Sequence, residues 1–185
     1  GAQAREPVDD YASFDAFLAD FRKESGTPAL SAVILRDGHI AWEGYYGWAD
    51  DEGEVPTSAD TTYKIASTTK PIAATAIIAE ALAGGLSLDL PMAADAGFAR
   101  TCEWLNESAI PFGSGGTDKH GNAIAPMDCG KPLTLAQMLD MRANGEAFVY
   151  NPIAYARIDR TIRGAGGRDL RAIVRDRVAE PAGMR

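Results

Sequence analysis

The spacing of apolar and polar positions predicts a helix and a β-hairpin at the start of the chain. Apolar residues recur at three- and four-residue steps over residues 8–23, with acidic residues between them, as on an amphipathic helix. Two runs rich in β-forming residues, 29–35 and 39–46, follow. They flank Asp37-Gly38, a dipeptide typical of a two-residue hairpin turn, so we expect an antiparallel pair of strands.

The rest of the chain is predicted to be helical or irregular. Residues 71–83 are small and apolar nearly all round, which predicts a buried helix that ends at Gly84-Gly85. Residues 93–131 are rich in glycine and proline, and we expect them to be mostly irregular. Three shorter helices are predicted over residues 134–141, 152–163 and 169–179, the first with a capping box formed by Thr134 and Gln137.

Length and charge narrow the functional classes. A chain of 185 residues is one domain, or one large piece of a two-part fold, and its apolar fraction of 46% can fill a core. No apolar run is long enough to predict a membrane span. The net charge of −8, with no basic stripe, argues against nucleic acid as a partner.

The few histidines and cysteines disfavour two kinds of site. His39 and His120 are the two histidines, and neither accompanies the Gly-x-Ser-x-Gly motif of many Ser-His-Asp hydrolases. Cys102 and Cys129 are the two cysteines, and these four residues are scattered along the chain. A zinc site is therefore not expected, and we predict no metal.

Cys102 and Cys129 flank a stretch rich in glycine, serine and asparagine. A disulfide between them would order that stretch, and two buried free thiols are the alternative. Residues 2–4, Ala-Gln-Ala, have the small-x-small form found near signal-peptide cleavage sites, although no apolar segment precedes them. We therefore expect a periplasmic or secreted location.

Ser67 and Lys70 form the most informative pair of residues in the chain. Three residues apart at the start of a predicted helix, they share one face, where an amine can take the proton of a hydroxyl. The alternative is an ordinary helix start, with Ser67 as the cap and a solvated Lys70. Since the helix is predicted to be buried, we expect the Lys70 amine at the edge of the interior, where it would lose its proton more easily.

Four segments in order are similar to the serine β-lactamase-like family. That family includes class C β-lactamases, D-alanyl-D-alanine carboxypeptidases, related esterases and D-amino-acid-specific peptidases, and the chain resembles its N-terminal half. The segments are the hairpin through Gly44-Tyr45-Tyr46-Gly47-Trp48-Ala49-Asp50, then Tyr63-Lys64-Ile65-Ala66-Ser67-Thr68-Thr69-Lys70-Pro71, Gly84-Gly85-Leu86-Ser87-Leu88-Asp89-Leu90-Pro91, and Gly145-Glu146-Ala147-Phe148-Val149-Tyr150-Asn151 with Tyr155 and Pro181-Ala182-Gly183-Met184.

The resemblance implies an α+β fold in which an antiparallel sheet is flanked by helices and joined to an all-helical subdomain. Residues 1–52 would hold the N-terminal helix and hairpin, and residues 53–185 the nucleophile helix and the mostly helical region. The family's later strands complete the sheet and supply one backbone N–H of the oxyanion hole. We expect these strands to come from a missing or separate polypeptide, because a hairpin alone is marginal in water.

The resemblance also assigns catalytic roles. Ser67 would be the nucleophile, Lys70 would help to deprotonate it, and Tyr150 would be a second proton carrier whose pKa a nearby Lys70 lowers. Without the resemblance, the favoured interpretation of Tyr150 is an aromatic residue packed for structural reasons. The implied reaction is acylation of Ser67 by a small-molecule or peptide acyl substrate, with no metal or organic cofactor.

One departure from the family pattern bears on the substrate. The family has asparagine two residues after the tyrosine, where this chain has Pro152. Asn151 stands one position early and is our candidate substrate-binding residue. A proline offers no side-chain amide, so an esterase- or peptidase-like activity is favoured over β-lactamase activity. A catalytically inactive binding or regulatory protein on the same scaffold, and an acyltransferase, are the alternatives.

Overall fold

The computed structural model describes residues 11–108, 116–117 and 120–184, which form two compact units. The first unit ends at Lys64 and the second begins at Ile65. The boundary that the sequence suggests, after residue 52, lies earlier along the chain. Residues beyond it stay with the hairpin because Trp48 pairs with Pro56 in an isolated antiparallel bridge.

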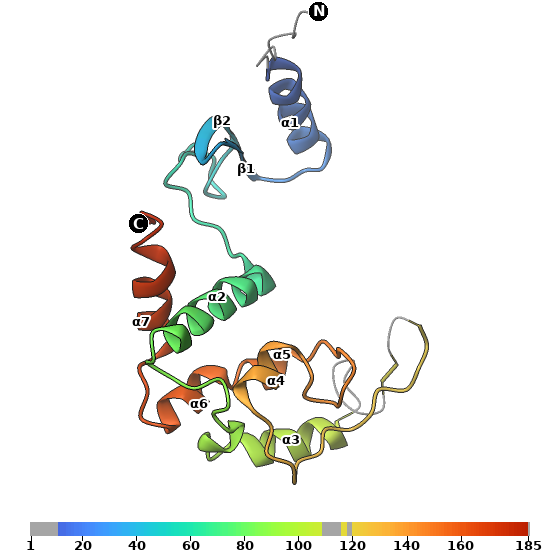
Figure 1. The fold of residues 1–185 in the computed structure, drawn as a ribbon. Helices are drawn as coiled ribbons and strands as arrows, with labels where there is room; N and C mark the ends of the chain where they lie inside the picture. Colours follow the sequence, from blue (N-terminus) through green and yellow to red (C-terminus); the bar gives the residue numbers. More distant parts are fainter. Residues whose placement is uncertain (1–10, 109–115, 118–119, 185) are drawn as a thin grey trace, which may run out of the picture. The chain divides into compact units, whose positions relative to one another are not determined.

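A two-stranded antiparallel sheet forms the centre of the first unit. Strands β1 (Ala29–Arg36) and β2 (His39–Gly47) pair from Ala29 opposite Gly47 to Arg36 opposite His39, with one irregularity after Ile34 (Figure 1). Asp37 (φ 51°) and Gly38 (φ 78°) both have positive φ, as the predicted two-residue hairpin turn requires. The predicted hairpin is thus confirmed.

Helix α1 (Ala12–Glu24) packs on this hairpin through aromatic rings. The ring centroids of Phe14 and Tyr11 lie 5.3 and 6.1 Å from that of Trp42. The part of the predicted helix before residue 11 lies outside the described residues. No residue of α1 is fully buried, so the helix covers the sheet only loosely.

Much of the hairpin's apolar surface remains exposed. Val33, Leu35 and Ile40 have exposed fractions of 55%, 67% and 61%. Among the described residues, β1 and β2 pair only with each other, so each strand has one unpaired edge. The hairpin therefore presents both apolar side chains and free backbone groups.

The second unit is helical. In Figure 1, α4, α5 and α6 lie between α2 and α3, and α7 lies beside α2. None of the helices in the described part of the chain is long and apolar enough to cross a bilayer. The elements are a 3₁₀ turn η1 (Ala66–Thr68), α2 (Thr69–Leu82), a 3₁₀ turn η2 (Met92–Ala94), α3 (Phe98–Glu107), α4 (Leu135–Leu139), α5 (Pro152–Tyr155), α6 (Ile158–Gly164), α7 (Leu170–Val174) and a π-helical turn η3 (Arg175–Ala179).

The apolar helix after the serine–lysine pair is only half buried within this unit. Ala73, Ala76 and Ile77 face the core, but Ile78 and Leu82 are 44% and 85% exposed. The prediction of burial all round is therefore wrong for this chain. The core of the unit contacts one face of α2, and the small alanines on that face allow close packing.

Helix α3 is the largest difference from the prediction, which made residues 93–131 mostly irregular. Phe98, Cys102 and Leu105 are buried and recur at positions i, i+4 and i+7 of this helix. That spacing is an amphipathic helix pattern, and the glycines and prolines farther along the segment obscured it. The helix anchors the early part of the segment to the core.

The three later helices form with adjusted ends. Thr134 and Gln137 make the predicted capping box of α4. The predicted helix over residues 152–163 divides into α5 and α6, and that over 169–179 into α7 and η3. The core that these elements share with α2 and α3 consists of Ala76, Ile77, Met92, Phe98, Cys102, Leu105, Met127, Leu135, Met138, Met141, Ala143, Ala154, Tyr155, Ile158, Ile162 and Ile173.

Candidate active site

Ser67 lies in the 3₁₀ turn η1, immediately before helix α2 begins. The preceding residue, Ala66, has φ of 44°, a backbone region that residues with a Cβ adopt only at a cost of about 1–3 kcal/mol. Pro71 falls in the first turn of α2, where its missing N–H costs little. The strained turn leaves Ser67 exposed at the start of the helix.

Three polar side chains meet at this point. The Ser67 Oγ lies 2.5 Å from the Tyr150 hydroxyl, and the Lys70 Nζ donates to the Ser67 Oγ at 2.9 Å and to the Tyr150 hydroxyl at 3.0 Å. Ser67 and Lys70 come from one turn of chain, whereas Tyr150 comes from the loop before α5. The structure thus brings together the three residues that the sequence suggested as catalytic.

Two aromatic rings lie close to the Lys70 amine. Its Nζ lies 5.1 Å from the ring centroid of Tyr150 and 5.7 Å from that of Tyr155, within the range of cation–π attraction. The Tyr155 hydroxyl also donates to the Lys70 backbone carbonyl at 3.1 Å. Tyr155 therefore joins α5 to α2 directly beneath the site. Sequence reasoning used Tyr155 only as a marker of the family motif and missed this contact.

The charge on Lys70 changes the acidity of Tyr150. The hydrogen bond from Lys70 is the main cause that lowers the pKa of the Tyr150 phenol below its ordinary value, and the hydrogen bond with Ser67 adds to it. The Lys70 Nζ is the donor in both of its contacts, and either oxygen of the Ser67–Tyr150 pair can donate to the other. The hydrogen bond between these two oxygens is therefore a direct path for a proton.

The backbone around Tyr150 is held at two points. The Val149 N–H donates to the Met141 carbonyl at 2.9 Å, which closes the loop after α4. On the other side Asn151 is the N-cap of α5, and its side-chain oxygen accepts from the Ala154 N–H at 3.0 Å. Tyr150 is therefore anchored between a loop closure and a helix start, with 36% of its surface exposed.

Asn151 does not face the site, which corrects its assignment as a substrate-binding residue. Its side chain is completely buried, and its amide nitrogen donates to the Asn144 Oδ1 at 3.3 Å and to the Met127 Sδ at 3.4 Å. With its oxygen occupied by the cap of α5, the whole amide serves the fold. Pro152 is the first residue of α5, a position that proline favours, so Asn151 stands directly before it at the N-cap.

A small groove borders the lysine. It measures about 330 Å³, and Lys70, Pro152 and Tyr155 contribute to its wall. Apart from Lys70 and Asp159, its charged residues, the wall is largely apolar, with alanine, proline, isoleucine and leucine side chains. At this wall Pro152 supplies an apolar ring where the family pattern has a side-chain amide.

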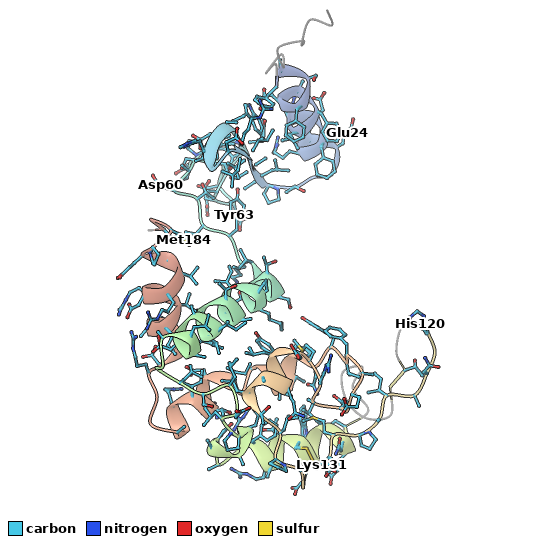
Figure 2. The ribbon with its side chains drawn as sticks, viewed as in Figure 1. Glu24, Asp60, Tyr63, His120, Lys131 and Met184 are labelled. Carbon is cyan, nitrogen blue, oxygen red and sulfur yellow. A yellow bond between two sulfur atoms is a disulfide. The ribbon has the colours of Figure 1, made fainter. Side chains whose placement is uncertain are left out.

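A disulfide supports the loop that leads toward the site. Cys102 on α3 is bonded to Cys129, with Cα atoms 5.7 Å apart (Figure 2). The Asn106 side chain adds two hydrogen bonds to the Met127 backbone, at 2.8 and 2.9 Å. Because Met127 also contacts Asn151, this segment packs directly behind the start of α5. The sequence left a disulfide and two free thiols open.

The two histidines lie in different units of the chain. His39 begins β2 in the first unit, and His120 lies in a turn of the second. Within residues 11–108, 116–117 and 120–184, no group of three or more histidine, cysteine, aspartate or glutamate side chains is arranged to hold a metal ion.

The sequence and the fold of this chain are shared with a known family. The chain belongs to the Beta-lactamase family, whose model matches residues 14–185. The family resemblance and the α+β fold class suggested by the sequence are thereby confirmed.

Among curated relatives, the chain is 35% identical to the esterase EstB of Burkholderia gladioli over 81 residues, which are 44% of this chain and 21% of EstB. It is 34% identical over 75 residues to the human mitochondrial serine beta-lactamase-like protein LACTB, covering 40% of this chain and 14% of LACTB. The matched segments therefore span 21% of EstB and 14% of LACTB, about a fifth or less of each relative.

Solved structures show the same fold. The octameric penicillin-binding protein homologue from Pyrococcus abyssi aligns with a TM-score of 0.60 and 20% identity, over 95% of this chain and 43% of that one. EstCE1, a hydrolase with promiscuous acyltransferase activity, aligns with a TM-score of 0.58 and 15% identity, over 94% and 52%. The chain thus corresponds to roughly half of each neighbour.

Proposed function

We propose that this chain carries the nucleophile of a serine hydrolase that cleaves an ester or amide through an acyl-enzyme on Ser67. The observation that supports this most directly is the three-way contact of the Ser67 Oγ with the Lys70 amine and the Tyr150 hydroxyl, all within 3.0 Å. An exposed serine with two proton-carrying partners at hydrogen-bond distance has the geometry of an activated nucleophile.

In the proposed acylation, the Ser67 oxygen bonds to the substrate carbonyl carbon as its proton passes to the Tyr150 phenolate. The carbonyl π electrons move onto the carbonyl oxygen and return as the bond to the leaving group breaks. Tyr150 then gives its proton to the leaving alcohol or amine. Water repeats the sequence on the acyl-enzyme and releases the acid. The Lys70 Nζ donates to both oxygens and so stabilises the phenolate.

Within this class, an ester is the substrate that we favour over a β-lactam. Pro152 places an apolar ring in the groove beside Lys70, where an asparagine could have donated to a substrate amide carbonyl. An ester substrate has no amide group that such a donor would orient. The identity to an esterase over 44% of the chain supports the same choice.

We also propose that a further polypeptide segment completes the sheet. Each strand of the hairpin has an unpaired edge, and its apolar side chains are exposed. Additional strands would cover both and would supply the second N–H donor of the oxyanion hole, which is typically worth a factor of about 10²–10³ in rate. The disulfide fits the periplasmic or secreted location that we propose, since disulfides persist in oxidising compartments.

The direct test is covalent labelling. A fluorophosphonate, added to the protein together with any segment that accompanies it naturally, should add one phosphonyl mass to a peptide that contains Ser67. Replacement of Ser67 by alanine should abolish the adduct, whereas Ser58→Ala, on an exposed serine outside the site, should leave it. An adduct-free wild-type protein that also fails to turn over p-nitrophenyl esters would instead support the inactive, regulatory scaffold.

Acyl transfer is the second candidate, because a structural neighbour is described as a hydrolase with promiscuous acyltransferase activity. The two outcomes differ only in the acceptor of the acyl group. Product analysis with an added alcohol separates them. If the amount of product ester rises with the alcohol concentration while the amount of free acid falls, the protein is a transferase.

A further inference from the structure

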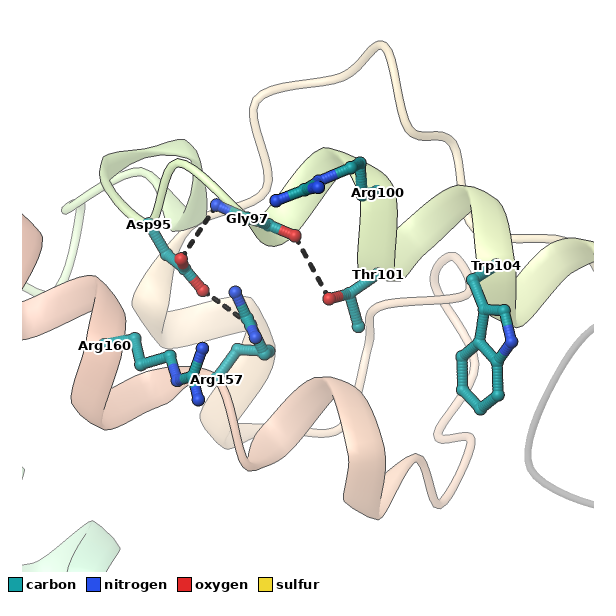
Figure 3. Close-up of a pocket in the computed structure, with 7 residues that line it drawn as sticks. All are labelled: Asp95, Gly97, Arg100, Thr101, Trp104, Arg157 and Arg160. Carbon is teal, nitrogen blue, oxygen red and sulfur yellow. Dashed lines mark hydrogen bonds and ion pairs between the residues drawn. The ribbon is translucent and has the colours of Figure 1, made fainter.

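A second concave site lies on α3, outside the Ser67 region. It measures about 450 Å³, and α3 contributes Arg100, Thr101 and Trp104 to its wall (Figure 3). The start of α6 contributes Arg157 and Arg160 to the same wall. No residue of the three-way contact lines this pocket, so the proposed catalytic chemistry gives no reason for it.

The pocket concentrates positive charge on an acidic protein. Three arginines and one aspartate, Asp95, line it, whereas the whole chain carries a net charge of −8. Arginines spaced by three residues, such as Arg157 and Arg160, lie on the same side of a helical turn. Like charges gathered in a hollow repel each other, and a bound anion would relieve that repulsion.

One ion pair fixes the base of this pocket. The Arg157 Nε donates to the Asp95 Oδ2 at 2.6 Å, and these two side chains are only 17% and 8% exposed. The other carboxylate oxygen, Oδ1, accepts from the Gly97 N–H at 2.9 Å. Both carboxylate oxygens of Asp95 are therefore engaged, and the Arg157 guanidinium is held in place rather than solvated.

Glycine at position 97 makes room for that guanidinium. A Cβ there would collide with the Arg157 Nη2, so the terminal amino group of Arg157 lies against the backbone of residue 97. Arg157 thus keeps donors beyond the one that it gives to Asp95.

Arg100 and Arg160 complete the cationic wall. Both are exposed, and within the described part of the chain neither pairs with an acceptor. Two unpaired guanidinium groups beside an ordered third one form an arrangement suited to an oxyanion, because guanidinium N–H groups match phosphate and carboxylate oxygens in a fork.

Trp104 adds a flat apolar surface to the same pocket. Its indole is 50% exposed and lies one helical turn after Arg100 on α3. An aromatic ring of a ligand can stack on the indole face, whereas an ion without a ring would leave that face exposed to water. From this combination we propose that the pocket binds a small ligand in which a phosphate or carboxylate is attached to an aromatic ring.

The proposal predicts which probes bind. Phenyl phosphate should bind saturably with one site in isothermal titration calorimetry, with a Kd of about 1 mM or lower at low salt. Benzoate should bind more weakly because it carries one negative charge instead of nearly two. Inorganic phosphate should also be weaker since it lacks the ring, and neutral phenol should not bind measurably.

Variants then locate the site. The double substitution Arg100→Ala and Arg160→Ala should weaken phenyl phosphate binding at least tenfold without unfolding the protein, because both side chains are exposed. Trp104→Leu should weaken phenyl phosphate but leave inorganic phosphate unchanged. Arg142→Ala, an exposed arginine outside the pocket, and Ser67→Ala should both bind as the wild type does.

Clear outcomes overturn the proposal. Binding of phenyl phosphate that is absent, non-saturable or unchanged by the double arginine substitution would show that this pocket is no anion site. Equal affinity for phenyl phosphate and inorganic phosphate would overturn the role of Trp104. Loss of binding in Ser67→Ala would move the ligand to the proposed catalytic serine and equally contradict a separate site.

Discussion

The Lys70 Nζ lies 3.0 Å from the Tyr150 hydroxyl, although the two residues are 80 positions apart in the chain. Lys70 also donates to the Ser67 oxygen at 2.9 Å, so one side-chain amine contacts both oxygens between which a proton passes in the proposed mechanism. The chemistry of the site depends on this arrangement, and two predictions test it.

The first prediction concerns Tyr150 as the proton carrier. Tyr150→Phe removes the phenolic oxygen but keeps the ring beneath Lys70, and it should lower kcat/KM for a p-nitrophenyl ester by about 10²–10⁴. Tyr63→Phe, on an exposed tyrosine of the first unit, is the matched control and should have little effect. Steady-state kinetics of both variants provides the measurement, and a Tyr150→Phe enzyme within a few-fold of wild type would remove Tyr150 from the mechanism.

The second prediction concerns pH. The hydrogen bond from Lys70 lowers the pKa of Tyr150, and the phenolate is the base in the proposed mechanism, so activity should rise as the pH increases through that lowered pKa. Lys70→Met removes the charge, and the rising limb should then move to higher pH. Lys70→Arg keeps a positive charge and should move it less. The pH profile of kcat/KM reports this order, and an unmoved limb in Lys70→Met would contradict it.

The third prediction follows from the burial of Asn151. Asn151→Ala removes the cap of α5 and leaves buried partners unsatisfied, so it should lower the free energy of unfolding by about 2 kcal/mol. KM should stay near that of the wild type because the amide does not face the site. Thr134→Ala removes a cap elsewhere and should cost about 1 kcal/mol. Urea denaturation and ester kinetics together decide between a structural and a substrate-binding role.

The fourth prediction concerns the disulfide. Cys102 and Cys129 are 27 positions apart, so replacement of both by alanine should cost about 3–4 kcal/mol on the chain-entropy model. A reductant should destabilise the wild type by a similar amount and leave the double variant unchanged. Equal stability of the wild type with and without reductant would show that the bond contributes little.

The fifth prediction concerns an ion pair behind the proposed nucleophile helix. The Glu80 side chain on α2 is only 5% exposed, and its carboxylate accepts from the Arg177 Nε at 2.6 Å, with Arg168 at 3.8 Å. Arg177→Met should destabilise the protein by about 2–4 kcal/mol, because it removes the nearest partner of a buried charge. Glu80→Gln should cost less, since Arg177 is 36% exposed and water can hydrate it.

The comparison between these two variants is the informative measurement. Arg171→Met, on the exposed side of α7, is the control for loss of an arginine and should change stability by less than about 0.5 kcal/mol. Chemical denaturation of all three variants gives the ranking. If Glu80→Gln lowers the free energy of unfolding more than Arg177→Met does, then an unpaired Glu80 carboxylate is not the main cause of the destabilisation.

The sequence by itself determined the local elements of this protein. Asp37-Gly38 specifies its hairpin turn, and Thr134 with Gln137 specifies a helix start, because both depend on residues within one turn of each other. The contact between Ser67 and Lys70 is local in the same way, since the 3₁₀ turn leads directly into α2 and keeps two residues three positions apart on one side. Helix α3 was also present in the spacing of its buried residues, although the composition of the surrounding segment pointed elsewhere.

Only the tertiary structure decided what depends on distant parts of the chain. The sequence offered Asn151 and Pro152 as neighbours in a motif, but packing against Met127 and Asn144 turned the asparagine inward and left the proline at the groove. Likewise, Tyr155 meets Lys70, and Arg157 meets Asp95, across long stretches of chain. Such contacts follow from how helices pack, because packing sets which side of a helix is buried and which residues of other segments it meets.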